Sequence, residues 1–164
     1  MDVLIHVESL RNLTVSQTDT FDVSFFPKGA PYKALVLLCV FDLIRKDDIQ
    51  TNRIPYVGSI EMRFETYKML LQSKLPGKLP MPYSALHHEP FWNLIMTNGV
   101  SYDKVHRELR IMKNLLQYVE FAQFELPFWD TLQFDEIRGV YRQTLLDTYF
   151  AEHLHSRLWE FGLR

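Results

Sequence analysis

The stretch of sequence that most restricts the fold of this chain is PYKALVLLCVFDLIRK, residues 31–46. Eight consecutive residues, 34–41, are apolar, and Asp42 ends the run. Pro31 suits the first turn of a helix, and the two cations at the end of the stretch suit its negative pole. A helix that is apolar on nearly every side has to be buried on every side. The pattern therefore predicts a central helix around which the other elements pack.

The segments on either side predict further helices and one short extended region. Residues 83–99 are expected to form short extended pieces before a turn at Asn98-Gly99. We therefore expect a single domain, 1–164, that is mainly α with a small β-hairpin or wing, a winged-helix-like arrangement. The other helices are expected within 2–15 with Asp2 as N-cap, 59–73 with Ser59 as N-cap, 104–119 and 134–161.

The charge of the chain is small in total but unevenly distributed. The formal net charge is −2, whereas residues 28–113 hold 13 Lys and Arg against 8 Asp and Glu, a local charge of +5. The remaining residues hold 5 against 12, a charge of −7. A positive middle with acidic ends fits local binding of a polyanion, and it fits an ordinary solvated surface equally well.

Motifs that would indicate an enzyme or a cofactor are missing from the sequence. The six glycines form no phosphate-binding loop, and no HExxH or CxxC motif occurs. His87 and His88 are adjacent, so on an extended chain their side chains would diverge rather than share a metal ion. Cys39, the only cysteine, lies in the apolar run, where burial makes a thiol unreactive. We therefore expect no catalytic residue, no metal and no cofactor.

The sequence also lacks the signals for a membrane or for secretion. No segment approaches the ~20 consecutive apolar residues that span a bilayer. The N-terminus, MDVLIHVESL, has no basic region and carries two acids, so we do not expect a signal peptide. A single cysteine fits a reducing compartment. These features predict a cytoplasmic protein, whose apolar final helices pack either internally or against a second copy in a homodimer.

The segment KLPMPYSALHHEPFWNLI, residues 78–95, is rich in proline, histidine and aromatic residues. Prolines hold the backbone at low entropic cost, and here they would present small apolar side chains beside two histidine donors. Such a surface can serve recognition. The other interpretation is a proline-braced connector whose aromatic residues pack into the core. Residue chemistry alone leaves both interpretations open.

Four motifs recur in an order that resembles a known family. They are APYKALVLLCVFDLI, NRIPY, EPFWNLIMTNG and LLDTYF, and with their surroundings they cover residues 29–150. The series is similar to the sulfur-binding domain of McrA-type HNH endonucleases, which recognises phosphorothioate-modified DNA. The resemblance implies a DNA-binding module that holds the sulfur atom in a small apolar surface cavity. It also implies double-stranded phosphorothioate-modified DNA as the partner and a role in restriction-modification.

The cavity of that family contains an aromatic–proline pair and an alanine three residues beyond the proline. Two alignments of this pattern compete in the present sequence. The first places Met81, Pro82 and Ala85 in the cavity. It keeps the proline and the alanine and offers a soft thioether in place of the aromatic ring.

The second alignment places Glu89, Pro90 and Asn93 in the cavity. It agrees better with the neighbouring aromatic pair and the Asn-Gly turn of the family motif. A carboxylate repels phosphate, however, and an amide is not an apolar wall. Under this alignment the chain would still be expected to bind DNA, but without a preference for sulfur.

We also expect polar and basic contacts to the DNA backbone and bases. The resemblance places some of them near the start of the long apolar helix, and the two histidines and the helix after the turn supply others. Their alternative roles are ordinary ones, such as a packing tyrosine, a lysine reaching along the surface and a solvated arginine. The expected contact residues are Lys28, Tyr32, Lys33, Ser84, His87, His88 and Arg107.

Members of the family often carry a C-terminal HNH nuclease domain, and we find no nuclease site in this sequence. We therefore interpret the chain as the non-catalytic sensor module of a modification-dependent HNH restriction endonuclease. Two other functions fit the same residues. One is a helical protein-interaction module, and the other is a winged-helix regulator that binds unmodified DNA.

Overall fold

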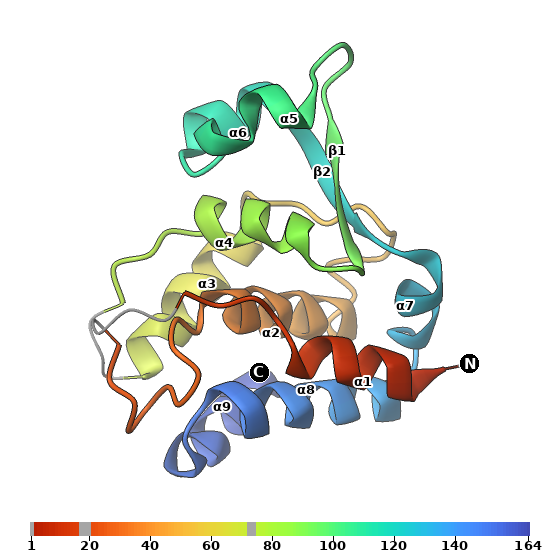
Figure 1. The fold of residues 1–164 in the computed structure, drawn as a ribbon. Helices are drawn as coiled ribbons and strands as arrows, with labels where there is room; N and C mark the ends of the chain where they lie inside the picture. The colour runs from red at the N-terminus through yellow and green to blue at the C-terminus, as the bar shows by residue number, and fades with distance from the viewer. Residues whose placement is uncertain (1, 17–20, 72–74) are drawn as a thin grey trace.

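A computed structural model describes residues 2–16, 21–71 and 75–164, and helices dominate it (Figure 1). The predicted fold class, mainly helical with a small antiparallel sheet, is confirmed. No helix within the described ranges is long and apolar enough to cross a membrane. The elements are α1 (Val3–Arg11), α2 (Tyr32–Arg45), α3 (Ser59–Leu70), α4 (Pro80–Ala85), the 3-10 helix η1 (Leu86–His88), β1 (Trp92–Met96), α5 (Tyr102–Val105), the 3-10 helix η2 (His106–Glu108), α6 (Met112–Tyr118), β2 (Val119–Phe124), α7 (Leu126–Thr131), α8 (Asp135–Tyr149), the 3-10 helix η3 (Glu152–Leu154) and α9 (His155–Gly162).

The apolar run forms α2, the central helix that the sequence predicts. Every residue from 32 to 44 is buried, and α3, α4, α8 and α9 pack against the helix. The last residue, Arg45, donates a hydrogen bond to the carbonyl of Gly162 at 2.9 Å. Cys39 is fully buried, and this burial raises the pKa of its thiol. The predicted position of this helix at the centre of the core is therefore confirmed.

A buried polar cluster ties α2 to α3 and α8. The Asp42 carboxylate accepts a hydrogen bond from Arg63 Nε at 2.7 Å, and it also contacts Arg142 and the Tyr67 hydroxyl. Desolvation lowers the pKa of the Arg142 guanidinium to about 10. Charges this far from water are tolerated only when they are paired and hydrogen-bonded. The cluster therefore fixes the positions of three helices relative to one another.

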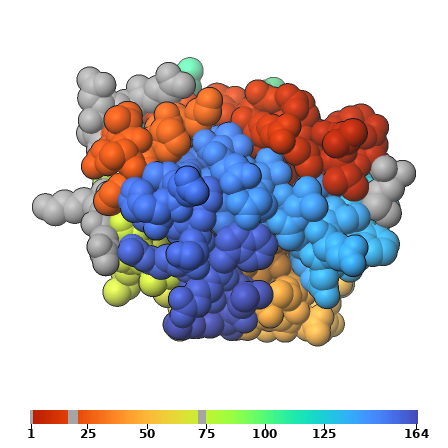
Figure 2. Space-filling model, turned by 90° about the horizontal axis from the view of Figure 1, so that it is seen from below, coloured from red at the N-terminus to blue at the C-terminus, as the bar shows by residue number. Residues whose placement is uncertain are grey.

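Helices α1, α8 and α9 cover the face of the molecule that Figure 2 shows. The predicted N-cap of α1 is confirmed, since the Asp2 carboxylate accepts a hydrogen bond from Ile5 N. Two tyrosines of α8 hold α1 in place. The Tyr149 hydroxyl accepts a hydrogen bond from Leu13 N at 2.9 Å, and the Tyr141 hydroxyl is hydrogen-bonded to His6 Nδ1 at 2.9 Å. Apolar residues of α8 and the residue that follows it are buried against the core: Leu145, Leu146, Tyr149 and Phe150.

Strands β1 and β2 form an antiparallel ribbon with a small lobe at its end (Figure 1). The predicted Asn-Gly turn follows β1, and Gly99 adopts φ +83°, which glycine tolerates without strain. The chain does not return directly from this turn, however. Residues 97–118, which we call the lobe, first form α5, η2 and α6. The pairing of the ribbon is irregular between Ile95 and Met96, where the lobe begins.

Two predicted elements differ from the structure. Residues 83–88 are helical, in α4 and η1, instead of extended. Pro80 and Pro82 occupy the first turn of α4, where backbone N–H groups have no helical partner, so these prolines start a helix rather than prevent one. The segment 104–119 is not one helix, because it breaks into α5, η2 and α6 before β2 begins.

The start of α3 also differs by one residue. Ser59 is the first helical residue, and Gly58 takes the N-cap position with φ +83°. The Glu61 side chain accepts a hydrogen bond from Gly58 N at 3.1 Å, which replaces the predicted serine cap. The last residues of the predicted helix 59–73 lie outside the described part of the chain.

Candidate nucleic-acid interface

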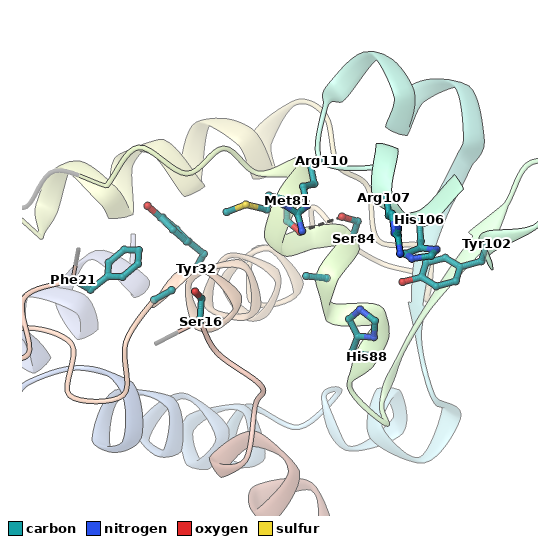
Figure 3. A pocket seen from close by; sticks show the side chains of 12 residues that line it. Ser16, Phe21, Tyr32, Met81, Ser84, His88, Tyr102, His106, Arg107 and Arg110 are labelled. Atoms are coloured by element: carbon teal, nitrogen blue, oxygen red, sulfur yellow. Dashed lines mark hydrogen bonds between the residues drawn. The ribbon is translucent and has the colours of Figure 1, made fainter. Parts of the chain in front are cut away.

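A pocket of about 340 Å³ lies where the lobe faces α4 and the start of α2 (Figure 3). Residues of α4 lie between its two sides, with residues of the lobe on one side and Tyr32 and Phe21 on the other. Three distant segments of the chain therefore meet there. Six of the residues predicted for the cavity or for DNA contacts line this pocket: Tyr32, Met81, Ser84, Ala85, His88 and Arg107.

Helix α4 supplies the soft, apolar part of the pocket. Met81 and Ala85 are four residues apart in one helix, so their side chains lie on the same face, and both are partly exposed in the pocket. Ser84 donates its hydroxyl hydrogen to the carbonyl of Pro80 at 2.8 Å, a hydrogen bond within the helix. Pro82 is buried and does not line the pocket, so its role is to shape the helix.

Tyr32 forms a fixed wall on the side of α2. Its ring is only 5% exposed, and its hydroxyl accepts a hydrogen bond from Gly77 N at 2.9 Å. A Cβ atom on Gly77 would lie 2.5 Å from the tyrosine ring, so only glycine permits this contact. Phe21 packs edge-on against the same ring at 5.7 Å. Burial raises the pKa of Tyr32, which keeps the wall uncharged.

A stack of three rings holds the lobe beside the pocket. Tyr102 lies between His87 of η1, 4.0 Å between ring centroids, and His106 of η2, at 5.4 Å. His106 Nδ1 donates a hydrogen bond to the carbonyl of Asp103 at 3.0 Å, which orients the ring. The stack therefore joins the lobe to the rest of the protein at the edge of the pocket.

Two arginines of the lobe give the rim a positive charge. Arg107 and Arg110 are exposed and line the pocket. Neither guanidinium forms an ion pair or a hydrogen bond with any residue that the structure describes. His88, which also lines the pocket, is exposed and likewise has no hydrogen-bond partner among these residues. These groups are available to an anionic ligand.

His87, in contrast, has a structural role. Its Nδ1 accepts a hydrogen bond from Leu94 N at 3.1 Å and thereby joins η1 to β1. Burial, and then the neighbouring His88, lower the pKa of His87 below its ordinary value of 6.5. The ring is therefore held neutral, with its proton on Nε2. His87 does not line the pocket and supports Tyr102 instead.

Acidification is expected to destabilise the protein partly through His87. The pKa of His87 is lower in the folded chain than in the unfolded chain, so as the pH falls below about 6.5 the unfolded chain binds the proton first. The stability that this histidine contributes above that pH is therefore lost as the pH falls. In His87→Asn the new side chain keeps an acceptor for Leu94 N but does not titrate. Urea denaturation at pH 7.5 and 5.5 should show a smaller loss of stability for the variant than for the wild type. An identical pH dependence of the two proteins would contradict this role.

The second alignment does not form an apolar cavity in the structure. Glu89 is 5% exposed, and its Oε2 accepts hydrogen bonds from Lys33 Nζ at 2.6 Å and from Thr14 N at 3.2 Å. Lys33 is only 9% exposed. The two charges neutralise each other inside the protein, so neither is free to contact DNA in this conformation. Pro90 and Asn93 are exposed and line none of the described pockets.

Lys28 also lies outside the pocket lining. It is exposed in the loop that leads to α2, two residues before Ala30, which does line the pocket. Of the two proline-based alignments, the structure therefore brings only Met81 and Ala85 of the first to a concave surface. The described residues hold no group of three His, Cys, Asp or Glu side chains placed to bind a metal ion.

Half of the pocket lining was not predicted from the sequence. His106 and Arg110, the two basic lobe residues among those missed, had a partial signal in the sequence. They lie in the positive middle of the chain, close to Arg107, which was predicted. The others come from a polar loop without a motif or depend on the fold of the lobe. The residues missed are Ser16, Phe21, Ala30, Tyr102, His106 and Arg110.

Comparisons with known proteins add no family to this description. No protein-family model matches the chain, and no curated protein matches it either. The resemblance to the sulfur-binding domain therefore stays a prediction that rests on the four motifs. Function has to be argued from the pocket and its chemistry.

Proposed function

We propose that this chain binds duplex DNA that carries a phosphorothioate linkage, and that the linkage enters the pocket beside α4. The observation that supports this most is the meeting of six predicted residues, from three distant segments, in one pocket. Met81 and Ala85 supply a soft apolar wall. His88, Arg107 and Arg110 supply donors and positive charge at the rim.

The apolar wall provides a physical basis for selecting sulfur. An ordinary phosphate oxygen pressed against Met81 and Ala85 would lose water without gaining a hydrogen bond, at a cost of roughly 1–3 kcal/mol. Sulfur is larger, more polarisable and a poorer acceptor, so it loses less. Selectivity for sulfur is then the difference between the desolvation penalty of the oxygen and that of the sulfur. The negative charge is common to both linkages, and the rim cations compensate it in both cases.

The size of the pocket suits a linkage rather than a single atom. A volume of about 340 Å³ lies at the lower end of ordinary ligand sites. It admits a phosphate group with part of the adjoining sugar, which places the sulfur against the wall while the sugar remains near the rim. In this proposal the chain recognises the modification and does not cut DNA. Cleavage would belong to a separate HNH domain.

The test is fluorescence anisotropy with a labelled duplex that contains one phosphorothioate linkage, measured beside the same duplex without it. We expect the modified duplex to bind about tenfold more tightly, a difference of about 1.4 kcal/mol that lies within the penalty above. Equal affinity would reject recognition of sulfur and leave a regulator of unmodified DNA. Absence of binding to both would favour the protein-interaction module.

A further inference from the structure

The lobe carries four cations, and two of them lie outside the pocket lining. Lys104, Arg107, Arg110 and Lys113 recur every third residue, and all four side chains are exposed. None of them forms a side-chain hydrogen bond or an ion pair within the described part of the chain. The two arginines line the pocket, whereas the two lysines do not. The positive charge of the lobe therefore continues past the pocket in both directions along the sequence.

The charge of the lobe differs in sign from that of the rest of the protein. Residues 97–118 hold four Lys and Arg against two Asp and Glu, a net charge of +2 in a chain whose total is −2. The two acids, Asp103 and Glu108, are exposed and do not pair with the four cations. A surplus of exposed, unpaired cations on one segment favours a surface for a polyanion.

We propose that the lobe is a second binding surface, which holds backbone phosphates of the duplex on either side of the linkage in the pocket. It binds these phosphates whether or not sulfur is present. The identity of the ligand in the pocket rests on the function proposed above. Arg107 and Arg110 serve both surfaces, and Lys104 and Lys113 serve the lobe alone. Lysine acts here as a point charge, which suits contacts that carry no sequence information.

The surroundings of Arg110 favour a DNA backbone that follows the lobe. A second pocket, of about 380 Å³, lies on the other side of this arginine. Glu61 and Glu65 line it together with Lys78 and Arg110, so its charged side chains balance and it has no positive surplus for phosphates. The lobe, in contrast, has a net charge of +2. The duplex is therefore expected to run along the lobe and not into the second pocket.

The experiment compares the double variant Lys104→Gln/Lys113→Gln with the wild type on modified and unmodified duplexes over a series of salt concentrations. Each lost phosphate contact reduces the slope of log K against log salt by about 0.9, so the slope should fall by about 1.8 for both duplexes. The ratio of the two affinities should not change. Lys46→Gln is the matched control, because Lys46 is also exposed but lines a different pocket, with Asp48 and Phe161. It should leave the slope unchanged.

The outcomes separate this inference from the proposed function. An unchanged slope in the double variant overturns the second surface. A loss of the affinity ratio together with the slope overturns it as well, because the lysines would then act through the pocket. The wild type could bind both duplexes equally while the double variant still shows a smaller slope of log K against log salt. That result would support the second surface and reject the recognition of sulfur.

Discussion

Glu89→Leu is expected to lower the free energy of unfolding by about 3–5 kcal/mol, because it leaves a buried ammonium without its partner. Lys33 is 9% exposed and its Nζ lies 2.6 Å from the Glu89 carboxylate. The substitution also removes the acceptor of Thr14 N. Urea denaturation measures the loss directly, as a lower midpoint at an unchanged m-value.

Two further variants show that the effect belongs to the buried pair. Replacing both partners, Lys33→Met with Glu89→Leu, should restore most of the stability, since two apolar side chains need no neutralisation. Glu160→Ala breaks an exposed ion pair with Arg164 and should cost no more than about 1 kcal/mol. If Glu89→Leu were as mild as this control, the pair would not be structural, and the second alignment would again be open.

Ala85→Asp is expected to weaken binding of the modified duplex by on the order of 30-fold and to abolish the preference for sulfur. A carboxylate at this position would stand in the wall against which the linkage is proposed to lie. Two like charges about 4 Å apart repel by about 1–4 kcal/mol between the dielectric limits of water and a protein surface. The new group would also make the wall polar. Fluorescence anisotropy with the modified and unmodified duplexes measures both effects.

Asn93→Asp is the matched control for this prediction. It adds the same charge at an exposed position of β1 that belongs to the second alignment. The preference for sulfur should survive this change. The opposite result, with the preference lost in Asn93→Asp and kept in Ala85→Asp, would assign the recognition to the second alignment.

The parts of the fold that the sequence predicts are those that depend on local patterns. The long apolar run defines α2, and Asp2 has the chemistry of an N-cap and acts as one. The Asn-Gly turn is also local and present. Strand β2 was missed although its sequence, VEFAQF, partly alternates in burial. The apolar residues before β2 have helical spacing that continues into its first residue, so the start of the strand was assigned to a helix. Its partner β1 lies more than twenty residues earlier in the chain, so no local hairpin pattern marks it.

The site could be predicted only in part, because its geometry depends on distant contacts. Lys33 and Glu89 are 56 residues apart, and no local pattern pairs them, so both were expected at the surface of a DNA-binding site. Arg110 and Tyr102 reach the pocket only because the ribbon places the lobe beside α4. Met81 and Ala85 were predicted together from the family pattern, in a segment expected to be partly extended, and it is the unpredicted helix α4 that places them on one face.

The most direct test of the central claim is a calorimetric titration of the wild type with three duplexes that differ only at one linkage. One duplex carries an ordinary phosphate, and the other two carry the separated diastereomers of a phosphorothioate at the same linkage. A chiral pocket with its apolar wall on one side should bind one diastereomer about tenfold more tightly than the phosphate duplex and should not favour the other to this extent. Equal affinity for all three duplexes would contradict the account.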